Sequence, residues 1–329
     1  MMPSLSVVVP VFNERAEDLA TTLTAVAEGL RRSPFADPEV LVVDDGSAVP
    51  ISPRPLPGVR TRVVRQSNRG RFQARRRGIE LATGEYVLLL DSRVRIDPAG
   101  LSWVAERVRA GEAAWNGHCR MANPDSPYAR FWNVLTRCAF TDYLDDPRTT
   151  SFTLTEYDRF PKGTGHFLAP RQWLLDAVEQ FDSRYQDSRF SSDDTHMLRS
   201  IAQRDRIHIS PEFASLYRNR EALMPFLRHA MHRGTTFYDG FARRGTRFFP
   251  IVIAAFPASL AGVALAVARP RAAGLALGGL SLGAIAFAAR RRPLEEAAAF
   301  GFLVAPFAAS FSAGLWRGGW LALRARAGP

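Results

Sequence analysis

A set of carboxylates and arginines supplies the residue types that chemistry on a phosphorylated substrate needs. A carboxylate accepts hydrogen bonds from sugar hydroxyls, holds a divalent cation, or takes a proton from an attacking hydroxyl. An arginine binds a phosphate through two parallel hydrogen bonds. The carboxylates of interest are Glu14, Asp44, Asp45, Asp91, Asp193 and Asp194, and the arginines are Arg69, Arg71, Arg75, Arg76, Arg77 and Arg93. These residue types suit a nucleotide substrate, which presents ribose hydroxyls and a diphosphate.

The elements that must position these side chains alternate between strand and helix. The pattern of valine-rich runs and spaced leucines predicts strands over 5–11, 39–43, 61–65 and 86–90, and helices over 16–32 and 70–83. Such alternation predicts an α/β fold, with an open, mostly parallel sheet and helices on both faces. Ligands of these sheets bind beyond the carboxyl ends of the strands. The polar clusters 12–14, 44–47 and 91–93 all follow strands, so we expect them to form a single site.

The chain beyond residue 100 is less regular. We expect strands over 113–120 and 163–169, and helices over 126–140, 171–179 and 194–203. The last of these helices begins beside Asp193 and Asp194, whose carboxylates are also good N-terminal caps.

The sequence changes character after residue 250. Residues 1–249 mix charged and apolar side chains, whereas 251–268, 272–289 and 297–316 are uncharged, apolar runs. Runs of this length approach the ~20 residues that a helix needs to cross a ~30 Å hydrocarbon layer. We interpret them as two to three transmembrane helices. Buried helices of a soluble domain are the alternative.

The placement of arginines leaves the number of crossings open. With the N-terminal domain in the cytosol, the arginines at 290–292 return to the cytosol after two crossings, as positively charged loops prefer. A full third crossing would place Arg317, Arg324 and Arg326 outside, against that preference. Two spans plus a re-entrant or interfacial third segment are the alternative.

Net charge and cysteine content indicate which partners and which cellular compartment to expect. The formal net charge is +11, which draws a protein to acidic lipid, a diphosphate or nucleic acid. The apolar runs favour a membrane, and no zinc-finger spacing or aromatic RNA-binding signature is present, so we expect no nucleic-acid partner. Cys119 and Cys138 have no metal-site spacing and make no disulfide framework. Because no signal peptide is recognisable, we expect a multi-pass membrane protein with a cytoplasmic catalytic domain.

Three motifs follow one another in an order that points to one family. PVFNE at 10–14, VVDDGS at 42–47 and NRGRFQARRRGIELATGEYVLLLDSR at 68–93 resemble the motifs of family-2 glycosyltransferases, which have the GT-A fold. The resemblance is dense over 5–100 and looser to about residue 220. It implies transfer of a sugar from a nucleotide-diphosphate donor, with inversion at the anomeric carbon.

The resemblance and the apolar runs together divide the chain. We expect a GT-A catalytic domain over 1–220, with a nucleotide-binding half at 1–100 and an acceptor half at 101–220. An amphipathic interfacial segment at 221–250 interleaves arginine and histidine with aromatic residues. A membrane anchor of two to three transmembrane helices covers 251–329.

The resemblance implies a set of donor-binding residues after the first two strands. Asp45 and Asp44 would contact the nucleoside, and Pro10, Phe12 and Glu14 would line the same pocket. The alternative for the two aspartates is a turn that caps the segment after them.

Arg75 stands where the family's ARN-type motif has its arginine. It lies near the start of a predicted helix, whose dipole and guanidinium groups suit a diphosphate. For the neighbouring arginines a solvated charged face is the better interpretation. Arg76 replaces the asparagine of the family motif. This replacement would alter the contacts to phosphate or acceptor.

The triplet Asp91-Ser92-Arg93 occupies the place of the family's Asp-x-Asp motif, which holds a metal on the donor phosphates. Asp91 would hold Mg2+ or Mn2+, with water and phosphate oxygens completing the coordination shell. Because a cation replaces the second carboxylate, an alternative follows. Arg93 itself would then neutralise the departing diphosphate, and the metal would be weak or dispensable.

Asp193 and Asp194 occupy the place of the family's Glu-Asp pair. Inverting transfer needs a base that deprotonates the acceptor hydroxyl, and by position Asp194 would be that base and Asp193 its supporting partner. Helix capping is the alternative role. Gly165 and His166 resemble the segment before the acceptor pocket, and a structural role is the alternative for His166.

We therefore expect an inverting glycosyltransferase of cell-envelope glycans. It would move a single sugar from a UDP- or GDP-type donor to a lipid, lipid-linked or other membrane-proximal acceptor hydroxyl. Residues 218–220 lack the tryptophan of the Gln-x-x-Arg-Trp motif of processive synthases, which disfavours polymer synthesis. A polyprenyl-phosphate glycosyltransferase and an inactive nucleotide-sugar-binding membrane scaffold are the two alternatives.

Overall fold

The computed structural model describes residues 1–326, which divide into two compact units. The sheet unit comprises Met1–Ala122, Asp145–Asp182 and Asp193–Arg218. The helical unit comprises Asn123–Leu144, Ser183–Ser192 and the chain from Asn219 onward. The division at residues 100, 220 and 250 that we drew from the sequence stays a prediction.

The sheet unit alternates strands with helices, as the sequence predicts. Its elements are β1 (Ser4–Val11), α1 (Ala16–Arg32), β2 (Ala36–Asp44), β3 (Arg60–Arg65), α2 (Arg71–Leu81), β4 (Tyr86–Leu90), β5 (Val94–Ile96), α3 (Pro98–Arg109), β6 (Ala114–Met121), β7 (Thr150–Phe152), a 3-10 turn (Tyr157–Arg159), β8 (His166–Pro170), α6 (Arg171–Glu179), α7 (Asp193–Arg204) and β9 (Ile207–Tyr217).

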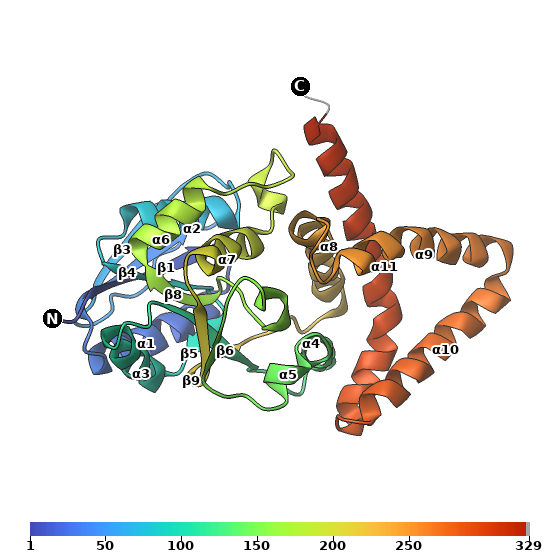
Figure 1. Cartoon of the computed structure of the whole chain (residues 1–329), viewed down its shortest axis with the longest axis horizontal. Coiled ribbons are helices and arrows are strands. Elements are labelled where there is room, and N and C mark those ends of the chain that lie inside the picture. The colour runs from blue at the N-terminus through green and yellow to red at the C-terminus, as the bar shows by residue number, and fades with distance from the viewer. Residues whose placement is uncertain (327–329) are drawn as a thin grey trace. The chain divides into compact units, whose positions relative to one another are not determined.

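The strands in the described residues form one nine-stranded sheet in the order β3-β2-β1-β4-β8-β6-β9-β5, with β7 paired to β9. Strands β1 to β4 run parallel, and Val11 of β1 lies opposite Asp44 of β2. In Figure 1, α1 and α3 cover one face of the sheet, and α2, α6 and α7 cover the other. The carboxyl ends of β1, β2 and β4 therefore meet at one edge, which confirms the predicted α/β fold.

The core of the sheet unit explains why these runs are strands and helices. Val7 and Val9 of β1 are fully buried, and Leu23 and Val26 of α1 are buried against the same face of the sheet. A strand covered on both faces must be apolar throughout, whereas a covering helix needs only one apolar stripe. Burial of each such aliphatic side chain contributes about 1.5–3 kcal/mol.

Strand β9 is the main element that the sequence pattern did not predict. It pairs parallel to β6 and antiparallel to β5 and β7. Its register against β6 shifts between Gly117 and His118, so that Gly117 pairs with Ser210 and His118 with Ala214. Pro211 falls in this bulge, where a proline is tolerated because its missing N–H is not needed for pairing.

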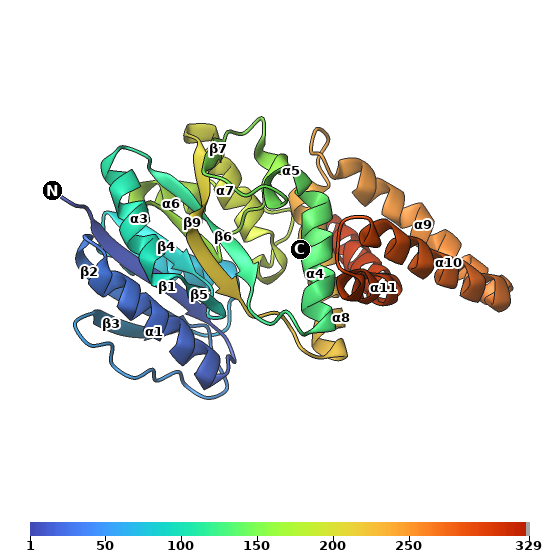
Figure 2. The same ribbon diagram turned by 90° about the horizontal axis from the view of Figure 1, so that it is seen from below.

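The helical unit is built from long helices. Its elements are α4 (Pro127–Ala139), α5 (Thr141–Leu144), a 3-10 turn (Ser188–Phe190), α8 (Leu223–Phe241), α9 (Phe249–Ala268), α10 (Pro270–Ala289) and α11 (Leu294–Arg326). Phe131 of α4, Phe226 of α8 and Phe300 of α11 form its buried core. Figures 1 and 2 show α10 and α11 side by side, meeting near the short turn that joins them.

In the described chain, α9, α10 and α11 are each long and apolar enough to cross a membrane. Leu275 and Val267 are each 81% exposed, and an apolar surface of this kind needs lipid or a partner to cover it. At ~1.5 Å per residue, the 33-residue α11 is about 50 Å long, whereas a hydrocarbon core is ~30 Å thick. The apolar runs are thus confirmed as three helices suited to membrane anchoring, and the number of crossings stays open.

Candidate active site

The loops that follow β1 and β2 are tied to each other. The backbone N–H of Asn13 donates to the hydroxyl of Ser47 (2.9 Å), and the Ala48 N–H donates to the Asn13 side-chain oxygen (2.8 Å). Asn13 has a φ of 50°, a left-handed conformation that asparagine tolerates. Phe12 is half exposed beside it, whereas Pro10 is buried within β1. These loops form one rim of the sheet edge.

Asp44 is fully buried at the end of β2 and holds its own loop. Its carboxylate accepts hydrogen bonds from the N–H groups of Ser47 (2.9 Å) and Ile51 (3.3 Å) and from the Arg65 guanidinium (3.0 Å). Burial raises the pKa of Asp44, but these hydrogen bonds and the charge of Arg65 outweigh burial and lower it. The carboxylate is therefore ionised at neutral pH, and its direct contact with a nucleoside stays a prediction.

Asp45 fixes the loop that begins α2. One carboxylate oxygen accepts from the Gln66 amide (2.7 Å) and the Arg69 N–H (3.0 Å), and the other accepts from the Gly70 N–H (2.8 Å). Gly70 has a φ of 91°, a conformation that glycine adopts without strain. Asp45 thus positions the first turn of α2, whereas Asp44 holds the turn that directly follows it. The predicted nucleoside contact of Asp45 is untested.

The first two turns of α2 present two arginines to a shared carboxylate. Arg71 donates to one oxygen of Asp193 (2.7 Å), and Arg75 donates to the other. The second terminal nitrogen of Arg75 lies 2.5 Å from an oxygen of Asp91. Two guanidinium groups therefore balance two carboxylates. We call these four residues, Arg71, Arg75, Asp91 and Asp193, the charge network.

Two members of the charge network, Arg75 and Asp193, are removed from water, whereas Arg71 and Asp91 are partly exposed. The side chains of Arg75 and Asp193 are each 1% exposed, and the Nε atoms of Arg71 and Arg75 are buried without a hydrogen-bond partner. Buried ions are tolerated only when they are paired. Burial raises the pKa of Asp193, but Arg71 and Arg75 reverse this effect and hold the pKa well below its usual range. Asp193 is therefore permanently ionised and cannot serve as a proton acceptor at neutral pH.

Asp194, the next residue, differs from Asp193 in both exposure and contacts. It is partly exposed in the first turn of α7, and its carboxylate accepts from the Thr195 N–H (2.9 Å). The pKa of Arg71 is raised mainly by Asp193 and that of Tyr157 mainly by burial, and the charge of Asp194 adds to both effects. Asp194 is thus the more exposed member of the pair, and its role as the base stays a prediction.

Gly165, just before β8, lies against Asp91. The Asp91 N–H donates to the Gly165 carbonyl oxygen (2.9 Å), and a Cβ on Gly165 would lie 2.8 Å from Oδ2 of Asp91. Only glycine leaves room for the carboxylate at this point. The sequence did not predict this approach of Gly165 to Asp91, and the predicted contact of Gly165 with an acceptor stays a prediction.

The fit of a divalent metal at Asp91 is partial. One carboxylate oxygen is committed to Arg75, which leaves Oδ2 as the oxygen that can face a cation. No group of three or more histidine, cysteine, aspartate or glutamate residues within residues 1–326 is arranged to hold a metal ion. Mg2+ and Mn2+ often take one or two carboxylates and complete their shells with substrate phosphates and water. Such a metal would therefore depend on the substrate for most of its ligands.

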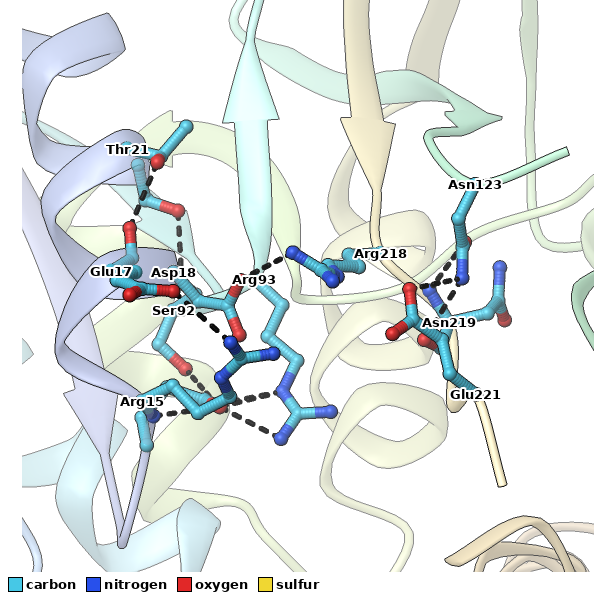
Figure 3. Close-up of polar contacts among 12 residues, drawn as sticks. Arg15, Glu17, Asp18, Thr21, Ser92, Arg93, Asn123, Arg218, Asn219 and Glu221 are labelled. Carbon is cyan, nitrogen blue, oxygen red and sulfur yellow. Dashed lines mark hydrogen bonds and ion pairs between the residues drawn. The ribbon is translucent and has the colours of Figure 1, made fainter. Parts of the chain in front are cut away.

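Arg93 is paired with Glu14, an arrangement that the sequence did not reveal. The Arg93 Nε lies 2.8 Å from both carboxylate oxygens of Glu14, and the Ser92 hydroxyl donates to Glu14 as well (2.9 Å). Figure 3 shows Ser92 and Arg93 together with Arg218 and Asp18, which form an ion pair (3.2 Å). The cation that replaces the second aspartate thus joins the loop after β4 to the loop after β1.

His166 lies inside the sheet unit. It is 4% exposed, its Nδ1 is 3.0 Å from the Ser215 hydroxyl, and its ring packs 4.2 Å from Phe213. Burial lowers the pKa of His166 to about 3, so the ring is neutral at pH 7. These contacts favour the structural alternative, and an acceptor contact for His166 stays a prediction.

The charge network also identifies a residue that the sequence interpretation undervalued. Arg71 was grouped with the solvated arginines, yet it binds Asp193. Its spacing was the available signal, because residues four apart on a helix lie on the same face and Arg75 follows Arg71 by four. Arg76 and Arg77 are exposed, as predicted for a solvated face.

A comparison with known families shows which family the chain belongs to. The family model described as Glycosyl transferase family 2 matches residues 6–185, more than half of the chain. The chain belongs to this family. The match includes the β1 and β2 loops, α2 and Asp91 and ends before Asp193, so the pair at the start of α7 lies outside it.

The relatives of this family-2 glycosyltransferase are distant. It is similar to the uncharacterized glycosyltransferase EpsJ of Bacillus subtilis (strain 168), with 24% identity over 232 residues, which are 66% of this chain and 62% of that protein. It also matches the uncharacterized protein y4gI of Sinorhizobium fredii, with 35% identity over 115 residues, 33% of this chain and 12% of that protein. The matches thus span less than two thirds of the length of either curated relative.

Among solved structures, the glycosyltransferase resembles the mannosyltransferase PcManGT from Pyrobaculum calidifontis, whose structure contains GDP-Man and Mn2+. The similarity covers 97% of this chain and 88% of that chain, with a TM-score of 0.54 and 20% identity. This likeness confirms the GT-A fold.

Proposed function

We propose that this glycosyltransferase transfers a single sugar, with inversion, from a UDP- or GDP-type donor to a lipid or lipid-linked acceptor hydroxyl. The observation that carries the proposal is the charge network. Through it, the start of α7, where Asp194 lies, is bonded to the helix and strand ends expected to bind the donor. An inverting transfer needs a base and a diphosphate-binding group on opposite sides of one anomeric carbon.

The donor would lie along the edge formed by β1, β2 and α2. Phe12, Glu14 and the loop held by Asp44 and Asp45 would surround the nucleoside. The diphosphate would meet the first turn of α2, where helix N–H groups and the partly exposed Arg71 attract an anion. Arg93, already paired with Glu14, would fix the nucleoside side of this pocket.

The chemical step follows from the difference between the two aspartates. The acceptor oxygen attacks the anomeric carbon, the carbon–oxygen bond to the diphosphate breaks, and the nucleoside diphosphate leaves with the electron pair. Asp194 takes the acceptor proton. Asp193, ionised and held by Arg71 and Arg75, keeps the first turn of α7 in place and does not exchange a proton.

A divalent ion at Asp91 belongs to this proposal. Mg2+ or Mn2+ would be held by Oδ2 of Asp91 together with phosphate oxygens of the donor, and would supply Lewis-acid stabilisation of the departing diphosphate. The solved mannosyltransferase contains Mn2+ together with its nucleotide sugar, which supports such an ion in this fold. Arg75 holds the other Asp91 oxygen and orients the carboxylate.

The acceptor class is inferred from the C-terminal helices. Three apolar helices hold the chain at a membrane in this proposal, and an acceptor reached from a membrane surface is lipid-borne or delivered there. The arginines at 290–292 lie between α10 and α11, as expected for a cytoplasmic turn. The catalytic domain would then face the cytoplasm.

The test is a screen of nucleotide sugars for thermal stabilisation of the purified full chain, with and without EDTA. Ligand binding to the folded state raises the melting temperature by mass action. We expect UDP- or GDP-sugars to stabilise the protein, and EDTA to reduce the effect. Stabilisation that EDTA leaves unchanged would remove the metal from the proposal, and no stabilisation by any nucleotide sugar would contradict donor binding.

A further inference from the structure

The segment before the catalytic pair is held by a buried carboxylate of α8. Asp239 is fully buried, and its Oδ1 accepts from the Ser183 hydroxyl (3.1 Å) and the Arg184 N–H (2.8 Å). Its Oδ2 accepts from the N–H of Ser192 (2.8 Å), the residue immediately before Asp193. One side chain thus fixes both ends of the segment Ser183–Ser192.

Further contacts bind the middle of this segment to the same helices. The Tyr185 hydroxyl donates to the Thr235 carbonyl oxygen of α8 (2.7 Å), and Arg184 donates to the Ala242 carbonyl oxygen (2.9 Å). The guanidinium of Arg317 on α11 lies 4.2 Å from the centre of the Phe190 ring. The segment is therefore attached to α8 and α11 along its length.

Helices α8 and α11 cross too closely to move independently. A Cβ on Gly234 of α8 would collide with the carbonyl oxygen of Phe311, and one on Gly314 of α11 would collide with that of Met231. The Thr235 hydroxyl donates to the Gly314 carbonyl oxygen across the crossing (3.1 Å). Asp239 is consequently fixed to the long apolar helix α11.

We propose that Asp239 is a positioning residue for catalysis, acting through Ser192 to set the first turn of α7 and the direction of Asp194. The inference rests on the proposed role of Asp194 as base. The Ser192 N–H belongs to the residue that enters α7, so its hydrogen bond orients the peptide that leads into Asp193 and Asp194. A base misplaced by about 1 Å costs on the order of 100-fold in rate.

The substitution Asp239→Asn tests the Ser192 contact selectively. Two donors, the Ser183 hydroxyl and the Arg184 N–H, favour the orientation in which the amide oxygen of asparagine faces them. The NH2 group then faces the Ser192 N–H, from which it cannot accept a hydrogen bond. Ser183→Ala is the comparison, because it removes the Ser183 bond to the same carboxylate, together with the bonds of that hydroxyl to the Tyr185 N–H and the Ser191 hydroxyl, and leaves the Ser192 N–H bond to Asp239 in place.

The full-length chain in detergent is assayed with GDP-mannose and UDP-glucose, and release of GDP or UDP is measured. For D239N we expect kcat to fall about 10- to 100-fold while the KM for the donor changes less than threefold. Hydrogen exchange of peptides covering residues 188–196 should accelerate at least tenfold. S183A should alter kcat and the donor KM less than threefold, because the Ser192 N–H bond to Asp239 remains. This separation of kcat from KM is not expected of a purely structural role.

The inference is overturned if D239N retains a kcat within threefold of the unmodified chain, or if kcat falls while exchange over residues 188–196 is unchanged. Tyr185→Phe supplies a second variant, which loosens the segment without touching Asp239 and should give a smaller change of the same kind. If the unmodified chain releases neither GDP nor UDP, the proposed function itself fails. If the unmodified chain is active and D239N has a similar kcat, the positioning role of Asp239 is contradicted and the proposed function is not.

Discussion

The acidic residues of the site differ in role because their partners differ. Asp44 and Asp45 accept hydrogen bonds from the loops around them and so fix the conformation of those loops. Asp193 neutralises two arginines in a buried setting, whereas Asp194, one residue later, is partly exposed. The sequence placed several of these residues at strand and helix ends, but it did not predict the pairing of Arg71 with Asp193 or of Arg93 with Glu14, which joins parts of the chain far apart in sequence.

Arg75 is expected to be the least replaceable member of the charge network. Arg75→Ala leaves Asp91 and one oxygen of buried Asp193 without a cation, and breaking a buried pair costs about 3–5 kcal/mol. We expect a fall in melting temperature of about 10 °C. The exposed Arg77→Ala on the same helix should shift it by less than about 2 °C. Equal shifts for both variants would show that the network does not stabilise the fold.

His166 is expected to make stability depend on pH. Burial lowers its pKa to about 3 from about 6.5 in the unfolded chain, so the unfolded state binds more protons between these values. The stability that neutral His166 contributes is complete above about pH 6.5 and is lost as the pH falls towards 3, at up to ~1.4 kcal/mol per pH unit.

Denaturation midpoints between pH 4.5 and 6.5 test this dependence. His166→Gln should flatten the slope of stability against pH over that range. Burial also lowers the pKa of His208, so His208→Gln is measured in parallel as the comparison. A slope for H166Q that matches that of the unmodified chain would contradict a neutral, buried His166.

At the scale of elements, the spacing of apolar residues predicted the strands and helices well where a segment is buried on both faces or along one stripe. The strands of the parallel half and helices α1, α2 and α6 match the predicted ranges closely, because their apolar positions repeat at strand or helix spacing. The second half mixes parallel and antiparallel pairs, and the bulge at Pro211 interrupts the alternation of β9. Such pairings are set by tertiary contacts, which single-sequence patterns do not contain.

The start of β8 gives a direct test of how elements meet at the site. Gly165→Ala would place a methyl group 2.8 Å from Oδ2 of Asp91 and displace that carboxylate. We expect at least a tenfold loss of sugar transfer with little change in melting temperature. Gly163→Ala is the matched control, because nothing lies within 4 Å of the added methyl group. Equal activity of the two variants would contradict a role of Asp91 in sugar transfer.

For the whole molecule, the apolar C-terminal runs were the clearest signal in the sequence, and they form α9, α10 and α11. Composition alone predicts such helices because lipid demands uninterrupted apolar surface. Composition did not predict that the chain before Asp193 would be bonded to α8 and α11, because those contacts join residues far apart in sequence.

The proposed orientation predicts which loops a membrane-impermeant thiol reagent reaches in intact cells. In a chain with Cys119 and Cys138 replaced by serine, a cysteine at Arg269, between α9 and α10, should be labelled from outside. A cysteine at Arg291, between α10 and α11, should be labelled only after the cells are opened. The reverse pattern would place the catalytic domain outside and contradict a cytoplasmic donor site.

The most direct test of the central claim is the turnover of the donor by Asp194→Asn. We expect kcat to fall at least 100-fold with the donor KM within threefold, because a general base contributes about 10²–10⁴-fold and does not bind the donor. Asp205→Asn, which changes an exposed aspartate just beyond the far end of α7, should leave kcat unchanged. Full activity of D194N would contradict the base and favour a phosphate acceptor that needs no deprotonation, as in a polyprenyl-phosphate glycosyltransferase.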